Sequence, residues 1–261
     1  MTVDQQIHRV VYDIETIGVL WESLTDEERA YVVKRAEGED DAEREASARR
    51  KLALSPLTGE VVIIGMQNID TGNARIHVRV PPPLPGEAHM YMEDAARMAK
   101  IAIEARAVGE GRVVSVVPWP NENALLANFW YDVDRYDQVF SFNGRAFDGP
   151  FVMTRSLILG VQAKKQLVPN RYGDDHIDLF DRLSYFGASR DRAGLDFWCR
   201  RCGITSPKEE MTGSEVEGLW RAGKIEEVCR YSLRDIEATT LLAQQYIRSF
   251  GRLYHMEPVR S

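Results

Sequence analysis

The sequence predicts an α/β fold built on a mixed central sheet, and the order of its elements carries that prediction. Apolar segments rich in β-branched residues come first, strands and helices mix in the middle, and helical patterns fill the end of the chain. This succession is typical of a sheet flanked by helices. With 261 residues, 44% of them hydrophobic, the chain can build one substantial core. We therefore expect a single domain over residues 1–261.

The strand predictions rest on short apolar runs bounded by turn-forming residues. The first run, Ile-His-Arg-Val-Val-Tyr-Asp-Ile, has the nearly continuous apolar character of a buried strand. The predicted strands are residues 7–14, 60–69, 74–80, 113–117 and 139–142.

Helical patterns occupy most of the remaining ordered sequence. The predicted helices are residues 92–108, 121–131 and 147–160, and three more within 192–250 that break near Gly203 and Gly223. Asn121 suits a helix N-cap because its short side chain can accept a hydrogen bond from the first turn. Residues 161–190 are predicted to be irregular, apart from one short ordered piece at 177–179.

One segment, residues 20–55, departs from this pattern because it is heavily charged. It contains Glu-Gly-Glu-Asp-Asp-Ala-Glu-Arg-Glu at 37–45 and Arg-Arg-Lys at 49–51. Mixed charges of both signs predict a solvated helix or a mobile insertion. The alternative interpretation is a flap beside an active site.

Charge and hydropathy favour a cytoplasmic protein that binds no membrane. No segment approaches the roughly 18 apolar residues of a membrane span, and the N-terminus lacks the basic and apolar regions of a secretion signal. The net charge is −7, whereas proteins that coat nucleic-acid phosphates are usually basic. Any binding of nucleic acid is therefore expected to be local, with metal ions supplying positive charge at the contact.

The three cysteines predict no disulfide framework because their number is odd. Cys199 and Cys202 form one C-x-x-C pair, and no second pair follows to complete the four ligands of a zinc site. Cys229 and His176 would have to be recruited from elsewhere in the fold. We interpret the cysteines as core or half-buried residues, with zinc and redox sites as the alternatives.

Three acidic fragments, far apart in the sequence, are the strongest functional signal. They are Val-Tyr-Asp-Ile-Glu-Thr at 11–16, Phe-Asn-Gly-Arg-Ala-Phe-Asp at 142–148 and Tyr-Ser-Leu-Arg-Asp at 231–235. Hard oxygen ligands in such number suit a pair of Mg²⁺ or Mn²⁺ ions, a general solution for cutting phosphodiester bonds. Together the fragments offer one phenol and four carboxylates, those of Tyr231, Asp13, Glu15, Asp148 and Asp235.

Local geometry places these side chains on common faces. Asp13 and Glu15 stand two apart at the end of a predicted strand, so both point to one face. Tyr231 and Asp235 stand four apart in a predicted helix and share a face as well. Asp148 lies where a strand gives way to a helix. Spacing alone leaves open whether the three places meet in the fold.

The ordered set resembles the three exonuclease motifs of the DEDD superfamily of 3′→5′ exonucleases, whose fold is ribonuclease-H-like. Asp-Ile-Glu-Thr at 13–16 resembles the first motif, residues 143–148 the second, and Tyr231-x-x-x-Asp235 the third. The resemblance spans about residues 7–247 and implies a mixed central sheet flanked by helices.

Within the superfamily, the chain is most similar to the proofreading exonuclease domain of family B DNA polymerases. Ser-Pro-Leu-Thr-Gly-Glu at 55–60 and His-Ile-Asp-Leu at 176–179 are similar to stand-alone bacterial relatives of that domain. The histidine branch carries a histidine five residues before the last aspartate, where this chain has Arg230. Tyr231 stands at the tyrosine position of the other branch, so the chain resembles a DEDDy enzyme.

The resemblance implies a role for each member of the set. Asp13 would bridge two metal ions, and Glu15 and Asp235 would complete the site of the ion that binds the attacking water. Asp148 would help to hold the second ion beside the leaving 3′-oxygen, and Tyr231 would orient the water. Independently of the family, a metal ion lowers the pKa of water, and two cations neutralise charge that builds on the phosphate.

Residues flanking the acids are the predicted substrate contacts. Asn143 and Phe147 belong to the second motif, which in the family lies near the terminal nucleotides. Phe147 would stack on a base or else anchor its helix to the core. Thr16 and Ile17 would meet the 3′ end through backbone N–H groups. Asp178 is interpreted as a structural or capping residue, with a supporting role beside the site as the alternative.

The sequence therefore predicts a metal-dependent 3′→5′ exonuclease that acts on the 3′ end of single-stranded DNA, in repair or turnover. Two alternatives stay open: a 3′→5′ exoribonuclease, which would contact the 2′-OH of RNA, and a non-catalytic nucleic-acid-binding module. The presence of all four acids argues against the module. Few residues follow position 250, so we expect any polymerase that this chain serves to be a partner in trans.

Overall fold

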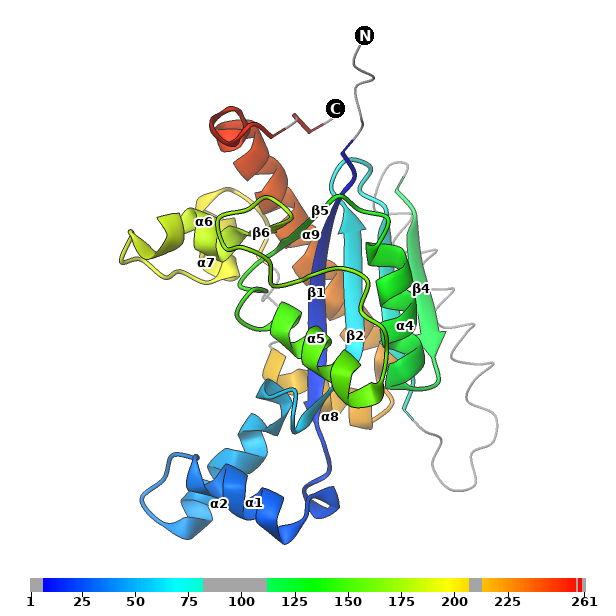
Figure 1. The fold of residues 1–261 in the computed structure, drawn as a ribbon, viewed down its shortest axis with the longest axis vertical. Coiled ribbons are helices and arrows are strands. Elements are labelled where there is room, and N and C mark those ends of the chain that lie inside the picture. Colours follow the sequence, from blue (N-terminus) through cyan, green and yellow to red (C-terminus); the bar gives the residue numbers. More distant parts are fainter. Residues whose placement is uncertain (1–6, 82–111, 207–212, 257, 260–261) are drawn as a thin grey trace.

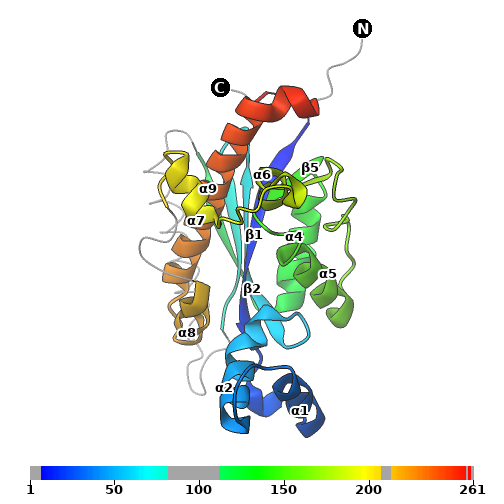
Figure 2. The ribbon, with the colours of Figure 1, turned by 90° about the vertical axis from the view of Figure 1, so that its left-hand side faces the viewer.

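A six-stranded mixed sheet forms the centre of the molecule, with helices on both faces (Figures 1 and 2). This computed structural model describes residues 7–81, 112–206, 213–256, 258 and 259. The predicted α/β class and the mixed sheet flanked by helices are confirmed, and the architecture is consistent with a ribonuclease-H-like fold. The helix predicted over 92–108 lies outside the described residues.

The strands lie in the order β4-β3-β2-β1-β5-β6. β2 is antiparallel to both β1 and β3, whereas β4 is parallel to β3, β5 to β1, and β6 to β5. Their bounds are β1 (Arg9–Gly18), β2 (Gly59–Asn68), β3 (Ala74–Arg79), β4 (Val114–Trp119), β5 (Gln138–Ser141) and β6 (His176–Asp178). β1 continues past Ile14, where the sequence predicted its end, so Asp13 and Glu15 lie inside the strand.

The helices follow the sequence pattern closely. Asn121 caps its helix as predicted, accepting a hydrogen bond from the N–H of Ala124 at 2.9 Å. Gly203 and Gly223 have left-handed φ angles of 71° and 72°, which end the helices before them. The helices are α1 (Asp26–Lys34), α2 (Asp41–Lys51), α4 (Glu122–Val133), α5 (Asp148–Leu159), α6 (Leu179–Leu183), α7 (Leu195–Arg201), α8 (Val216–Arg221) and α9 (Ile225–Phe250).

The sequence did not predict the short helical elements of the fold. α6 falls in the segment predicted to be irregular, because its five residues are too few to show a helical period. The short 3₁₀ turns are Trp21–Ser23, Leu52–Leu54, Tyr185–Gly187, Gly213–Glu215 and Gly251–Tyr254. Within the described parts of the chain, no helix has both the length and the apolar character needed to cross a membrane.

Two apolar cores lie on opposite faces of the sheet. Tyr12 and Ile14 of β1 pack into the core beneath α4 and α5, whereas Val11 and Ile17 pack into the core beneath α8 and α9 (Figure 2). Side chains alternate along a strand, so the odd-numbered residues of β1 face α9. The acids of β1 therefore point toward the helix that carries the third motif.

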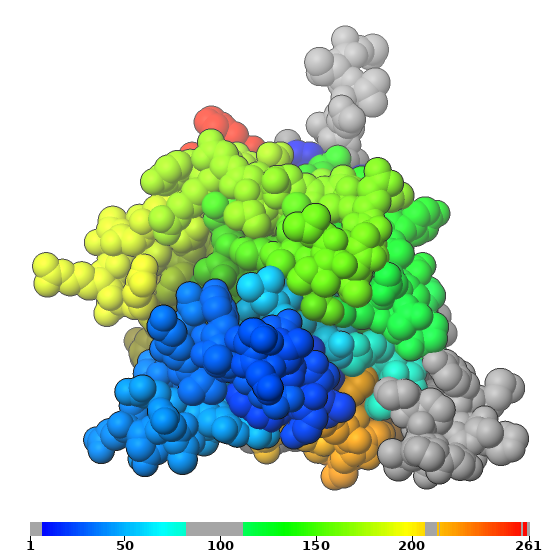
Figure 3. All heavy atoms as spheres, turned by 60° about the horizontal axis from the view of Figure 1, so that its bottom comes forward, coloured from blue at the N-terminus to red at the C-terminus, as the bar shows by residue number. Residues whose placement is uncertain are grey.

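The charged segment forms a helical hairpin, α1 and α2, beyond the end of β1 (Figure 1). Its atoms form the blue group at the front of Figure 3. Thr25 and Glu28 form a capping box at the start of α1, and that helix has no buried residue. The Thr16 hydroxyl donates a hydrogen bond of 2.7 Å to the carbonyl of Ala53. This bond ties the base of the hairpin to β1 directly after Glu15.

α9 approaches the sheet closely at Gly65, the residue of β2 that pairs with Asp13. A Cβ at this position would lie 2.8 Å from Ser232 Oγ and 2.9 Å from Ile236 Cγ2, closer than real side chains pack. Ser232 and Ile236 are fully buried on α9. The missing side chain at position 65 therefore allows the helix to lie against the sheet beside Asp13.

Gly65→Ala is expected to destabilise the protein because the new methyl group must push α9 outward. Overpacking of this kind costs about 1–3 kcal/mol of unfolding free energy, which urea denaturation measures. Gly218→Ala is the matched control, since nothing lies within 4 Å of its new Cβ in α8, and it should leave stability equal or slightly higher. Equal stability of the two variants would contradict the close approach of α9.

Candidate metal centre

The first and third acidic fragments meet at one place in the fold. Carboxylate oxygens of Asp13, Glu15 and Asp235 all lie within 4.8 Å of one another. Asp13 and Glu15 come from the middle of β1, and Asp235 comes from α9, which covers that face of the sheet. In the part of the chain that the structure describes, this is the one group of three or more His, Cys, Asp or Glu side chains at metal-binding spacing.

Asp148 approaches the same place from the edge of the sheet. β5 pairs with β1 only at residues 9–11, so β1 extends beyond its parallel neighbour. Further along that edge, the N–H of Ile14 donates a hydrogen bond of 3.0 Å to Asp148 Oδ1. Asp148 is the first residue of α5. Its carboxylate takes the place of a backbone carbonyl that β5 would offer to Ile14 if that strand were longer.

Burial and mutual repulsion raise the pKa values of these acids. The pKa values of Asp13 and Glu15 lie well above their usual range, chiefly because burial disfavours the charged form and then because neighbouring carboxylates repel. Burial is also the main cause that raises the pKa of Asp148 to about 7, against the hydrogen bonds from backbone N–H groups. Asp148 contributes to the raised pKa of both Asp13 and Glu15, so it lies close to them.

This donor set fits divalent cations of the Mg²⁺ or Mn²⁺ kind. Such ions prefer hard carboxylate oxygens, and converging carboxylates that resist ionising together are stabilised when a cation joins them. Asp13, Glu15 and Asp235 would hold one ion, and Asp148 extends the set on the side of β5. The arrangement can therefore concentrate positive charge beside a bound phosphate.

Tyr231 lies one turn before Asp235, on the same face of α9. Its side chain is buried, and its pKa lies far above the usual value, first because of burial and then because of the charges of Glu15 and Asp235. The phenol is therefore protonated at neutral pH. It can donate a hydrogen bond to an oxygen in the site, and it cannot serve as a base.

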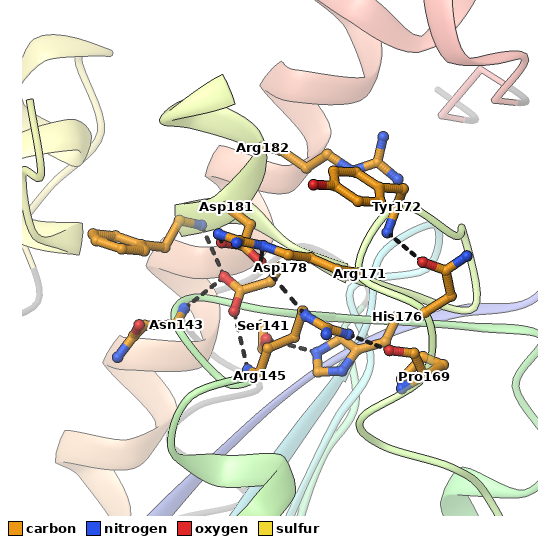
Figure 4. Close-up of polar contacts among 12 residues, drawn as sticks. Ser141, Asn143, Arg145, Pro169, Arg171, Tyr172, His176, Asp178, Asp181 and Arg182 are labelled. Carbon is orange, nitrogen blue, oxygen red and sulfur yellow. Dashed lines mark hydrogen bonds and ion pairs between the residues drawn. The ribbon is translucent and has the colours of Figure 1, made fainter. Parts of the chain in front are cut away.

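Asp178 fixes the loop that leads to Asp148 (Figure 4). Its Oδ1 accepts hydrogen bonds from the backbone N–H groups of Asn143 at 2.8 Å and Phe180 at 2.9 Å, and its Oδ2 accepts one from Arg145 at 3.0 Å. It thus caps α6, as the sequence predicted, and also holds the loop between β5 and α5. Asn143 has a left-handed φ of 65°, which asparagine tolerates better than most residues.

The predicted substrate contacts surround the acids in different ways. The side chain of Ile17 is only 1% exposed and belongs to the core, so only its backbone can meet a ligand. Thr16 is half-buried, with its hydroxyl bonded to Ala53. Phe147 is half-buried and packs on Phe151 with 5.4 Å between ring centroids, which matches the anchoring interpretation. Asn143 is half-buried in the loop that Asp178 holds.

The cysteines and His176 take no part in this centre. Cys199, Cys202 and Cys229 are free thiols, and among the described residues none of them joins a group of three potential metal ligands. His176 is buried, and burial lowers its pKa to about 4. The neutral ring lies 2.7 Å from Ser141 Oγ (Figure 4) and 2.6 Å from the Leu167 carbonyl, and these two contacts link β5 and β6 to the preceding segment.

Comparison with known proteins decides the family. A family described as predicted 3′–5′ exonucleases related to the exonuclease domain of PolB matches residues 94–257. The chain belongs to this family. Its relatives include an uncharacterized protein of Methanocaldococcus jannaschii, 31% identical over an alignment of 131 residues that covers 46% of this chain and 70% of that protein. Membership in this exonuclease family implies nucleic acid as the class of substrate.

The family match covers the second and third acidic fragments but not the first. Asp148, Tyr231 and Asp235 lie within the matched residues, whereas Asp13 and Glu15 precede them. The sheet joins the two regions, because β1 carries its acids to the helix that holds Asp235.

Sequence reasoning missed two contributors to this exonuclease-family site. Gly65 had no motif to mark it, although a glycine inside an apolar strand is a signal of close backbone approach. The hold of Asp178 on the loop before Asp148 was also missed, because it depends on β6 pairing beside β5.

Asp148→Asn is expected to change how the stability of the metal-free protein depends on pH. A folded-state pKa near 7, above the roughly 3.9 of an unfolded aspartate, stabilises the wild type at low pH. That contribution is lost as pH rises from about 4 through 7, whereas asparagine stays neutral and can still accept the Ile14 bond. The variant should therefore gain stability relative to wild type between pH 5 and pH 8.

Urea denaturation in chelator at several pH values measures this difference. Asp134→Asn, at an exposed position after α4, serves as the control and should follow the wild-type curve. Parallel curves for wild type and Asp148→Asn would show that the carboxyl group of Asp148 is not perturbed.

Proposed function

We propose that this chain is a metal-dependent 3′→5′ exonuclease of the DEDDy type that removes nucleotides from the 3′ end of single-stranded DNA by a two-metal-ion mechanism. Family membership supports exonuclease chemistry. The observation that carries the proposal is the convergence of Asp13, Glu15 and Asp235 within 4.8 Å, with Asp148 at the adjoining edge of β1.

The positions and charges of these residues support a separate role for each in the two ion sites. Burial is the main cause of the raised pKa of Asp13, followed by the charges of Asp148, Glu15 and Asp235. Because Asp13 lies within 4.8 Å of Glu15 and Asp235, and its neighbour Ile14 binds Asp148, Asp13 would serve as a ligand of both ions. Glu15 and Asp235 would complete one ion site, and Asp148 the other. When bound, the two ions would lower the pKa of a water molecule and neutralise charge on the phosphate. Tyr231 would hold the water by donating its phenolic hydrogen.

The remaining assignments follow from position. Backbone groups at Thr16 and Ile17, with the side chains of Asn143 and Phe147, would contact the terminal nucleotides. We further propose one exonuclease domain over residues 1–261 in which the charged hairpin at 20–55 is an insertion, and a cytoplasmic role in DNA repair or turnover.

Digestion of 5′-labelled oligonucleotides tests the activity. The protein should shorten single-stranded DNA stepwise from the 3′ end with Mg²⁺ or Mn²⁺ and leave it intact in chelator, while a matched RNA strand reports any preference between the two. Asp13→Asn should abolish cleavage yet leave the metal-free melting temperature equal or higher, because it removes one repelling charge. No digestion by wild type with either metal would refute the proposal.

Tyr231→Phe tests the proposed hydrogen bond to water. Removing the hydroxyl should lower kcat by roughly tenfold or more, since a positioned donor contributes about that much or more. Affinity for single-stranded DNA, measured by fluorescence anisotropy in chelator, should change little because the ring remains. Wild-type kcat in this variant would remove the phenol from the mechanism.

A further inference from the structure

A cavity of about 350 Å³, lined mainly by polar residues, adjoins the loop that leads to Asp148. Its volume falls at the lower end of the roughly 300–1,000 Å³ typical of ligand pockets. Three arginines from separate segments line it: Arg145 from the loop after β5, Arg171 from the segment before β6, and Arg192 from the segment before α7. We call this cavity the arginine pocket.

The pocket carries more positive than negative charge. Its two carboxylates are Asp178, whose oxygens accept backbone N–H groups, and Asp181. Asp181 binds Arg171 through two hydrogen bonds and lies 3.5 Å from Arg145 Nε (Figure 4). Three guanidinium groups thus face two carboxylates, in a chain whose net charge is −7.

Hydrogen bonds hold the guanidinium groups of Arg145 and Arg171 in place, and all three arginines still have N–H donors to offer. Arg145 donates to the Pro169 carbonyl at 2.8 Å, and Arg171 directs Nε and Nη2 at Asp181, which leaves its Nη1 edge available. Arg171 is 42% exposed in its side chain. Arg192 is exposed, lies 5.8 Å from the ring centroid of Phe180, and makes no ion pair with a carboxylate among the described residues.

We propose that the arginine pocket binds the phosphodiester backbone of the single strand immediately 5′ of the nucleotide that is removed. This inference rests on the proposed function, which places the 3′ end at Asp148. The loop of residues 143–147 separates the two sites, so a strand that leaves the acidic cluster across this loop reaches the three arginines. Guanidinium groups suit phosphate because their planar forks match its oxygens, and such contacts do not depend on base sequence.

The arginine pocket also explains how a chain with a net charge of −7 could bind a negatively charged strand. Single-strand binding needs positive charge along the backbone. Here three arginines gather in one cavity beside the loop that leads to Asp148, as the local binding that the sequence predicts would require.

The test compares a long substrate with one too short to reach the pocket. Octathymidylate spans both sites, whereas thymidine 5′-monophosphate p-nitrophenyl ester occupies only the acidic site. Arg192→Ala and Arg171→Ala should each lower the ratio of kcat/KM for the octanucleotide to that for the ester by about tenfold. The slope of log affinity against log salt for octathymidylate should become shallower by about 0.7 for each phosphate that the variant no longer binds.

Arg135→Ala is the matched control. Arg135 is also an exposed arginine over an aromatic ring, 4.3 Å from the centroid of Tyr131, but it lies between α4 and the start of β5, whereas Arg145 of the pocket follows the end of β5. Its removal should leave the ratio and the salt slope at wild-type values. Ratios and slopes in the pocket variants that equal those of this control would overturn the proposal.

Binding measurements separate this inference from the proposed function. Anisotropy of labelled octathymidylate in chelator reports the pocket without any cleavage, so weaker binding by Arg192→Ala supports the pocket even if wild type hydrolyses neither substrate. Failure to hydrolyse the ester and the octanucleotide refutes the exonuclease proposal alone. If the variants instead weaken only inhibition by free thymidine 5′-monophosphate, the pocket holds the released nucleotide and the strand proposal is wrong.

Discussion

Electrostatic repulsion among clustered carboxylates is the constraint on which the rest of this structure depends. Asp13, Glu15 and Asp235 converge, although burial and the charges of neighbouring carboxylates, Asp148 among them, raise the pKa values of Asp13 and Glu15. Folding must hold them together against a cost that a cation would relieve. The apolar packing of α9 against the sheet and the hydrogen bond from Ile14 to Asp148 supply that hold. Carboxylates that repel one another in this way favour the binding of a cation.

The position of β1 in the sheet brings together acids from three segments that are far apart in the sequence. β1 is buried on both faces, and its odd-numbered side chains meet α9, while its edge beyond β5 receives the N-terminus of α5. Acids from three distant segments thus reach one place: Asp13 and Glu15 from β1 itself, Asp235 from the helix over its face, and Asp148 from the edge beyond β5. Gly65 completes the arrangement, because a side chain there would separate α9 from the strand pair.

Much of this could be predicted from the sequence, since the strands and the long helices carry strong periodic signals. The pattern that placed Tyr231 and Asp235 on one face of a helix holds within the 26 residues of α9. The sequence could not show which residues that are far apart along the chain lie close together in the fold. The meeting of residues 13 and 235 depends on β2 pairing in one register, and the hold of Asp178 on the loop after β5 depends on β6 lying beside that strand. Short elements such as α6 also escaped, because five residues show no helical period.

The loop between β5 and α5 has a consequence for how this protein can vary. Asp178 anchors it through two backbone N–H groups, its last residue leads into the carboxylate of Asp148, and its middle supplies Arg145 to the adjacent cavity. Under the proposed function, cleavage and binding of the strand would therefore both depend on this one loop. A substitution that loosens the loop would alter both together, so the two properties cannot be tuned independently there. Substitutions that change only the affinity for the strand would have to fall at Arg171 or Arg192, which belong to separate segments.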